Sequence, residues 1–168
     1  SGANAPTIAY NATGLADGSN SLWVFVSDDG GSTWSSGVSF TLLRDDVAPT
    51  AATSISTTPG SVPLGTTYTV TYTPNDARST SANELFCGIY TGAGGTGTQL
   101  ATNLATSGSG VTTGAITDAA LVAGANTRYI RTRDGANNFT DTSFTVTGIV
   151  RNHFVTSISQ AVQRSSVR

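Results

Sequence analysis

The sequence predicts an all-β protein, and three observations support this fold class. Only 11% of the 168 residues are charged, whereas roughly a quarter are charged in typical globular domains. The chain contains 29 Thr and 20 Ser, which favour strands and turns respectively. Apolar and polar residues alternate repeatedly, while no helical apolar period persists for three turns before the last 21 residues. The net charge of only -2, together with this alternation, argues against a disordered chain.

One pattern occurs twice, about 106 residues apart, at residues 15–34 and 121–140. The shared residues are Leu15, Gly18, Asn20 and Asp28, matched by Leu121, Gly124, Asn126 and Asp134, and then Ser39-Phe40-Thr41, matched by Ser143-Phe144-Thr145. The first copy starts too near residue 1 to contain the front half of a repeat of about 100 residues, the size of one β-sandwich module. We therefore expect a partial module over residues 1–46, a complete module over 47–147 and a tail over 148–168.

Seven strands separated by turn signals are expected within the complete module. They cover residues 53–57, 66–73, 84–91, 99–105, 110–117, 127–133 and 139–147. In the second of them Tyr68, Val70 and Tyr72 alternate with threonines, which predicts one apolar face and one hydroxyl face. Proline, glycine and asparagine predict turns or loops at 58–60, 73–76 and 92–97. Seven short strands in about 100 residues are typical of an immunoglobulin-like sandwich.

The segments that flank the complete module are less regular. Asp45 and Asp46 precede Pro49, which cannot continue a central strand, so a module boundary is expected there. In the tail, Phe154, Ile158, Ala161 and Val162 have helical spacing, but residues 154–159 would also serve as a strand. A short helix and a donor strand both remain open for this segment.

Charge and composition argue against two classes of partner. The pI is near 5.0 and the eight basic residues, all Arg, form no cluster, so nucleic-acid binding has no electrostatic basis. The longest apolar run is LWVFV at residues 22–26, far short of the roughly 20 residues that span a bilayer, so no membrane insertion is expected.

Cys87 is the only cysteine and lies in an alternating run, which predicts burial as a small hydrophobic residue.

No catalytic, cofactor or metal site is expected. A glycosidase needs two facing carboxylates, but Glu84 is the only Glu and most Asp residues lie in turn-like contexts. A nucleophilic triad needs a His or another base, but the sequence has no nucleophile-elbow motif with which the single His153 could act. Calcium would accept the oxygen-rich runs Asp28-Asp29-Gly30 or Asp45-Asp46, but neither has a known ligand spacing. We therefore predict a protein that is not an enzyme.

One motif is more specific than the repeat around it. Residues 27–34, SDDGGSTW, fit the Asp-box pattern S-x-D-x-G-x-T-W through Ser27, Asp29, Gly31, Thr33 and Trp34. We expect a self-stabilised hairpin turn, in which a carboxylate accepts backbone N–H groups, glycine permits positive φ and the Trp plugs the base. In the propellers that carry several such boxes the motif is structural, so it implies no glycosidase activity here.

With these residues in view, the two copies resemble the C-terminal halves of bacterial immunoglobulin-like repeats that occur in tandem on secreted and surface proteins. Such repeats end in a strand, an Asp-Gly-Asn-rich turn and a final strand, and RDGANNFT at residues 133–140 is similar to that turn. The resemblance implies a secreted or cell-surface location. Its motifs are short, so it specifies fold better than function.

The first copy carries large apolar residues on both faces of its strand. Leu22, Val24 and Val26 occupy the inward positions, whereas Trp23 and Phe25 occupy the outward ones. Each such side chain left in water forgoes about 1.5–3 kcal/mol of burial, so we expect both faces to pack against something. A partial module also exposes unpaired strand edges. These features predict strand complementation, in which a segment of another chain completes the half-sandwich.

The expected function is therefore that of an extracellular structural protein that associates with itself, as a subunit of a surface fibre or appendage. The candidate subunit contacts are Trp23, Phe25, Phe154 and Ile158. A fragment of a longer array is the alternative origin of the half-module. The alternative functions are an adhesion or carbohydrate-binding module, in which Trp23 or Trp34 stacks on surface glycans, and an accessory domain of a secreted glycoside hydrolase.

Overall fold

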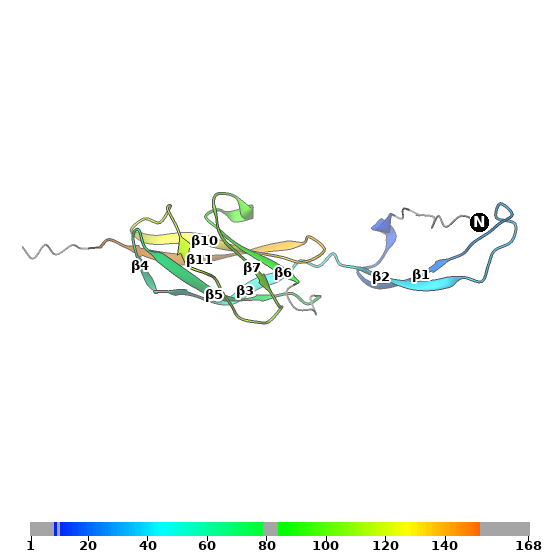
Figure 1. Ribbon diagram of the computed structural model, residues 1–168, viewed down its shortest axis with the longest axis horizontal. Coiled ribbons are helices and arrows are strands. Elements are labelled where there is room, and N and C mark those ends of the chain that lie inside the picture. Colours follow the sequence, from blue (N-terminus) through cyan, green and yellow to red (C-terminus); the bar gives the residue numbers. More distant parts are fainter. Residues whose placement is uncertain (1–8, 10, 79–83, 152–168) are drawn as a thin grey trace, which may run out of the picture.

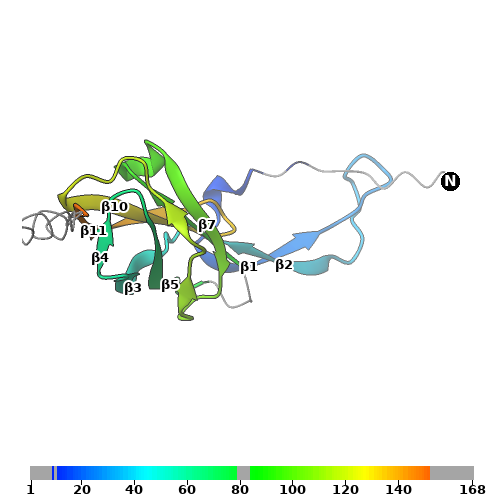
Figure 2. The same cartoon turned by 60° about the vertical axis from the view of Figure 1, so that its left-hand side comes forward.

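The computed structural model describes residues 9, 11–78 and 84–151, and within them the predicted all-β class is confirmed. The described chain forms strands and two short 3-10 helices, η1 (Ala12–Gly14) and η2 (Ala93–Gly95). In this part of the chain no helix is long and apolar enough to cross a lipid bilayer. Figures 1 and 2 show an immunoglobulin-like sandwich with a separate hairpin extending from one end.

The hairpin consists of β1 (Gly18–Val24) and β2 (Val38–Arg44), which pair antiparallel as a two-stranded sheet of their own. The sandwich follows, with a five-stranded sheet in the order β4-β11-β10-β6-β7 opposite a sheet of order β3-β5-β8, with β9 pairing β5. Its strands are β3 (Thr50–Thr58), β4 (Ser61–Pro63), β5 (Thr67–Asn75), β6 (Leu85–Tyr90), β7 (Gln99–Ala105), β8 (Val111–Thr112), β9 (Ile116–Thr117), β10 (Gly124–Arg133) and β11 (Phe139–Ile149).

The core of the sandwich lies between these two sheets. Tyr68, Val70 and Tyr72 of β5 are at most 2% exposed, as their alternation with threonine predicted. They pack against side chains of the opposite sheet that are equally buried, among them Ile89, Ile130 and Val146. Cys87 is buried and free, which confirms the expectation from its position in an alternating run.

Three details of the strand prediction were wrong. Residues 73–76 were expected to form a turn, but β5 continues to Asn75 with Pro74 inside it. The pairing of β5 with β3 shifts in register here, and such an irregularity accommodates a residue without an N–H donor. The strand expected at 110–117 is divided into β8 and β9, which both pair with β5. The three-residue β4 was missed because it is too short for alternation to show.

A buried ion pair supports the end of the sandwich near β10. The Arg128 guanidinium Nε lies 2.7 Å from Asp118 Oδ2, and both side chains are nearly inaccessible to solvent. The Tyr68 hydroxyl donates to the same carboxylate at 3.1 Å. Burial raises the pKa of Tyr68, and the neighbouring negative charge of Asp118 raises it further, so the phenol stays protonated and keeps donating.

The repeated residues make the same local structure in both copies. The Asn126 side chain accepts from Val122 N–H at 3.0 Å and donates to the Val122 and Gly124 carbonyls. Asn20 makes the same three bonds, at 3.2, 2.8 and 2.8 Å, with residues 16 and 18. The bracketed glycines share a positive φ, 99° at Gly18 and 97° at Gly124, a region that glycine adopts without strain.

The strand register extends this equivalence along the hairpins. Leu22 pairs with Phe40 in the first copy, as Arg128 pairs with Phe144 in the second. The offset between the copies is thus 106 residues in the first strand and 104 in the second, because the first hairpin has the longer turn. The hairpin β1–β2 is therefore the structural counterpart of β10–β11, the last hairpin of the sandwich.

The two asparagines provide a matched test of burial. Asn126 is 6% exposed and also approaches the Val146 carbonyl, so we expect Asn126→Ala to lower the free energy of unfolding by about 2–3 kcal/mol. Asn20 is half-buried, and water replaces its bonds, so Asn20→Ala should cost less than about 1 kcal/mol. Urea denaturation of both variants measures the difference. Equal losses would contradict the role assigned to burial.

Candidate functional site

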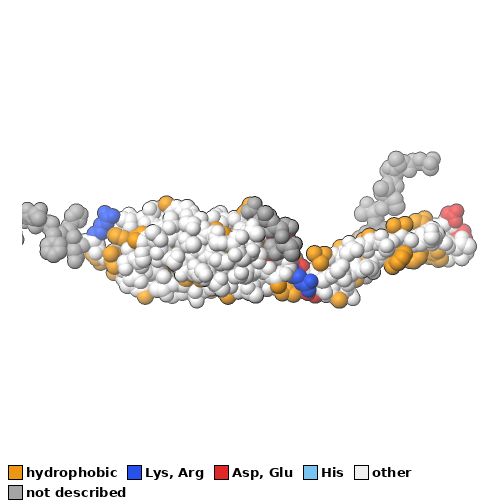
Figure 3. Space-filling view, turned by 90° about the horizontal axis from the view of Figure 1, so that it is seen from below, with side chains coloured by type: hydrophobic (Ala, Val, Ile, Leu, Met, Phe, Trp, Pro, Cys, Tyr) orange, Lys and Arg blue, Asp and Glu red, His pale blue; other side chains and the backbone are white. Residues whose placement is uncertain are grey.

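The hairpin β1–β2 presents an apolar face that no described strand covers. In β10–β11 the corresponding face is the core side of the sandwich, where Ile130 and Val146 are 0% exposed. The counterpart of Ile130 is Val24, which is 42% exposed, and the counterpart of Phe144 is Phe40, which is 46% exposed. Residues of core type thus occupy core positions without a second sheet. Figure 3 shows apolar side chains gathered along the hairpin, in contrast to the sandwich face beside it.

This face is continuous from one end of the hairpin to the other. Val26 and Val38, which flank the turn, are more than half exposed. At the other end Leu22 and Leu42 are half-buried. In the sandwich the sheet β3-β5-β8 covers the equivalent surface of β10–β11, and among the described strands the hairpin has no such layer. The arrangement is that of half a sandwich.

The opposite face of the hairpin carries two stacked aromatic rings. The ring centroids of Trp23 and Phe25 lie 6.4 Å apart with an interplanar angle of 23°. They lie over Gly37, where a Cβ atom would approach the Phe25 ring to 2.5 Å, so the stack requires glycine at this position. Trp23 is 59% and Phe25 51% exposed. No second layer of the described chain reaches either face, so their coverage by another segment stays a prediction.

The turn between β1 and β2 is built around the Asp29 carboxylate. Its Oδ1 accepts the Ser27 hydroxyl and the N–H groups of Ser32 and Thr33 at 2.8 to 3.0 Å. Its Oδ2 accepts the Thr33 hydroxyl at 2.6 Å. The Ser27 hydroxyl in turn accepts Gly31 N–H at 2.7 Å, and Gly31 has a φ of 94°. Every one of these bonds is local, so the carboxylate is occupied by its own turn.

The Trp of this motif lies against the turn but is not buried there. Trp34 is 62% exposed, and it shares a shallow apolar pocket with Phe25 on the outer face. A Cβ atom added at Gly31 would lie 3.5 Å from Trp34 Cζ2, so the indole contacts the turn, but no second layer of the described chain covers it. Of the predicted subunit contacts, Trp23 and Phe25 lie together on this outer face, whereas Phe154 and Ile158 lie outside the described residues.

The junction between hairpin and sandwich is held by polar contacts. Arg78, just beyond β5, forms an ion pair with Asp17, which also accepts Asp46 N–H at 3.0 Å. The Asn138 side chain donates to the Asp45 carbonyl at 3.0 Å, from the turn between β10 and β11. Apolar contact contributes little here, so these few bonds determine how the hairpin is attached.

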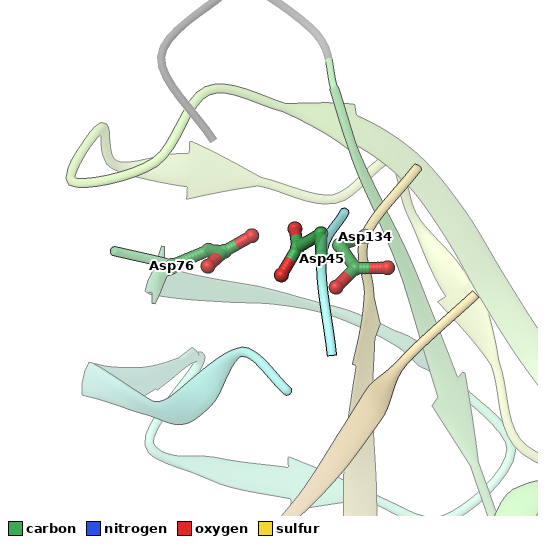
Figure 4. A group of neighbouring side chains, drawn as sticks. All are labelled: Asp45, Asp76 and Asp134. Atoms are coloured by element: carbon green, nitrogen blue, oxygen red, sulfur yellow. The ribbon is translucent and has the colours of Figure 1, made fainter. Parts of the chain in front are cut away.

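Three carboxylates meet at this junction. Asp45, Asp76 and Asp134 each place one oxygen within 4.8 Å of the other two, and Asp76 and Asp134 are only 6% and 5% exposed (Figure 4). Glu84 lines the same pocket. No metal ligands were expected here, because the run Asp45-Asp46 has no known ligand spacing; Asp76 and Asp134 join Asp45 from two other segments of the chain. Of the two oxygen-rich runs considered, Asp45-Asp46 contributes Asp45 to this cluster, whereas Asp46 pairs with Arg44; in the other run Asp29 is held in its own turn.

Several other side chains of the described chain have structural roles. Burial raises the pKa of the Cys87 thiol, which keeps it protonated and a poor nucleophile. On the outer face of the five-stranded sheet, Arg131 pairs with Asp141 and stacks 4.1 Å from the centre of the Phe139 ring. Arg133 similarly lies 5.1 Å from the centre of the Phe86 ring. Each guanidinium lies over one face of its ring, and both phenylalanines remain about half exposed, Phe86 at 50% and Phe139 at 51%.

No protein-family model matches the sequence, and no curated protein resembles it closely enough to be counted as a match.

The Asp29 turn has a defined pH dependence. Hydrogen bonds from the Thr33 hydroxyl, the Thr33 N–H and the Ser27 hydroxyl lower the pKa of Asp29 well below the usual 3.8. A lowered pKa in the folded state means that the carboxylate stabilises the turn above pH 3.8 and loses this effect only as the pH falls through the lowered value. In an NMR titration the Thr33 amide signal should therefore stay in place from pH 7 to pH 4 and move only in stronger acid.

Asp29→Asn supplies the control for that titration. The variant keeps the size of the side chain but removes the charge, so the Thr33 amide should lose its acid transition. A midpoint for Asp29 at or above 3.8 would contradict the geometry of the turn.

Proposed function

We propose that the protein is an extracellular structural subunit that assembles into a surface fibre or appendage by β-strand complementation between copies. The observation that carries this proposal is the apolar face of β1–β2, whose residues match the core side of β10–β11 but lack an opposing sheet among the described strands. A face of this kind is stabilised when another segment covers it, since each buried Val or Phe side chain contributes about 1.5–3 kcal/mol.

The occupant we propose is the part of the predicted tail that follows β11, residues 150–168, of a second copy. β11 ends at Ile149, at the end of the sandwich opposite the hairpin (Figure 1). Ile149 and Val150 are exposed, and the sequence that follows contains the predicted contacts Phe154 and Ile158. A donor at one end and an acceptor at the other make a head-to-tail contact, which extends into a filament when the rotation between copies does not close a ring.

The secreted or cell-surface location is part of the same proposal. It is supported by the Ser- and Thr-rich, weakly charged composition and by the resemblance of both copies to repeats of surface proteins. In a fibre of such modules, the polar outer faces of the complete module would be exposed to water. Along β5, for example, threonines alternate with buried residues.

The proposal predicts concentration-dependent association of the full chain. Sedimentation velocity between about 1 µM and 1 mM should show growing oligomers, and negative-stain microscopy should show regular filaments.

Phe40→Ser, on the uncovered face, should weaken association at least tenfold because it removes a large apolar side chain from the interface. Leu104→Ser is the matched control: Leu104 is 52% exposed on β7, away from the hairpin, and its loss should leave association unchanged.

A chain that ends at residue 151 tests the donor. It should remain monomeric, and a peptide of residues 152–168 should bind it. A full chain that stays monomeric up to 1 mM would contradict the fibre proposal, whereas a truncated chain that assembles as well as the full chain would exclude this donor.

A second candidate function, glycan binding, is favoured by the exposed aromatics on the outer face of the hairpin. Trp23, Phe25 and Trp34 are each more than half exposed, and aromatic faces of this kind stack on sugar rings. Glycan-array binding by the monomer that is lost in Trp34→Ala, but retained in Phe40→Ser, would support this function in place of assembly.

A further inference from the structure

The junction carboxylates have the arrangement of a cation site. Asp45 lies in the segment between β2 and β3, Asp76 directly follows β5, and Asp134 directly follows β10. Figure 4 shows the three carboxyl groups directed toward a common space, although their segments belong to the hairpin connection and to both sheets of the sandwich. The 4.8 Å limit on their separations is informative, because two oxygens bound to one Ca²⁺ at about 2.3–2.6 Å lie no more than about 5 Å apart.

A buried oxygen without a partner independently points to a missing ligand. Asp76 is 6% exposed, and its Oδ2 atom is buried without a hydrogen-bond partner. Its other oxygen accepts Arg78 N–H at 2.9 Å. A buried carboxylate oxygen that is neither hydrogen-bonded nor ion-paired is costly, so native structures rarely keep one without a proton or a cation beside it.

The basic side chains near the cluster do not neutralise its negative charge. The Arg78 side chain, which reaches the same pocket, is paired with Asp17, and Arg44 is paired with Asp46. Among the described residues, no ion pair reaches Asp45, Asp76 or Asp134. The three carboxylates of the cluster therefore have no ion pair of their own among the described residues.

Backbone groups hold each carboxylate in place. Oδ1 of Asp45 accepts Val47 N–H at 3.1 Å, and Oδ1 of Asp134 accepts Asn138 N–H at 2.8 Å. The Asn138 side chain bonds both Asp134 Oδ2 and the Asp45 carbonyl, so it connects two of the three segments. Hydrogen bonds of this kind orient carboxylates toward a metal in known sites, and the second lone pairs of these oxygens remain available.

We propose that Asp45, Asp76 and Asp134 bind a Ca²⁺ ion that fixes the hairpin to the sandwich. All three ligands are hard carboxylate oxygens, which favours Ca²⁺ over zinc, and they come from three separate segments rather than one loop. Ca²⁺ tolerates such irregular geometry, whereas Mg²⁺ demands a near-ideal octahedron. The pocket opens to solvent, so water completes the coordination of the ion.

The position of the site gives the ion a mechanical role. One ligand belongs to the connection that carries the hairpin, and the other two belong to opposite sheets of the sandwich. Binding would cross-link these three segments and set the direction in which β1–β2 extends. The inference does not depend on the fibre proposal, since a monomer would bind the ion equally well.

Calcium binding is tested on the full chain by isothermal titration calorimetry and by thermal unfolding in Ca²⁺, Mg²⁺ or EDTA. We expect a single site with a dissociation constant between about 10⁻⁵ and 10⁻³ M, and a melting temperature raised by Ca²⁺ but much less by Mg²⁺. An equal response to Mg²⁺, or no response at 10 mM Ca²⁺, would overturn the assignment.

Asp76→Asn distinguishes a metal ligand from an ordinary buried acid. It removes the unpartnered charge while keeping an oxygen for Arg78 N–H, so the variant should melt higher than the parent in EDTA yet bind Ca²⁺ at least tenfold more weakly. Asp45→Asn should weaken binding similarly. Asp28→Asn, an exposed acid in the hairpin turn, is the matched control and should bind as the parent does. Unchanged Ca²⁺ affinity in both Asp45→Asn and Asp76→Asn would exclude this site.

The mechanical role has its own readout in limited proteolysis. Trypsin cleaves this chain only after Arg, and Arg44 lies one residue before Asp45. Saturating Ca²⁺ should slow cleavage after Arg44 at least fivefold in the parent and in Asp28→Asn, but not in Asp76→Asn. Cleavage that is independent of Ca²⁺ in the parent, despite measured binding, would contradict the cross-link.

Discussion

A β-sheet with apolar residues on one face requires a second layer, and this requirement governs the whole molecule. In the sandwich it is met within the chain, because the face of β10–β11 packs against the sheet β3-β5-β8. In the hairpin β1–β2 the same positions hold Val24, Phe40 and their neighbours, and the described chain supplies no layer for them. The two hairpins differ less in their own structure than in what lies opposite them.

Their likeness rests on a small hydrogen-bonding unit that needs no tertiary support. An asparagine side chain bridges the N–H and C=O groups of the residue four positions earlier, and a glycine with positive φ lies between them. Because all partners are within four residues, Asn20 can form this unit in a half-module as well as Asn126 does in a packed one. The Asp29 turn is similarly self-contained, which explains why the hairpin keeps a defined shape without a core.

The junction between hairpin and sandwich, in contrast, depends on contacts between residues far apart in the sequence. Attachment of the hairpin depends on contacts between distant parts of the chain, such as Asp17 with Arg78 and Asn138 with the Asp45 carbonyl. These contacts are polar, and interfaces between modules of one chain are commonly more polar than cores. Acidic groups concentrate in this region, so electrostatics rather than apolar burial decides the geometry of the junction. The proposed ion would act at this polar junction.

The sequence by itself determined the fold class and most of the strands, because period-two alternation and turn residues are local signals that burial merely reinforces. It also determined the equivalence of the two copies, which Gly18 and Asn20 share with Gly124 and Asn126. Only the tertiary structure decided that Pro74 lies inside a strand, that Trp34 is exposed, and that Asp45, Asp76 and Asp134 meet. The physical reason is the same in each case: these features depend on which distant segment packs against a residue, and no spacing along the chain encodes that neighbour.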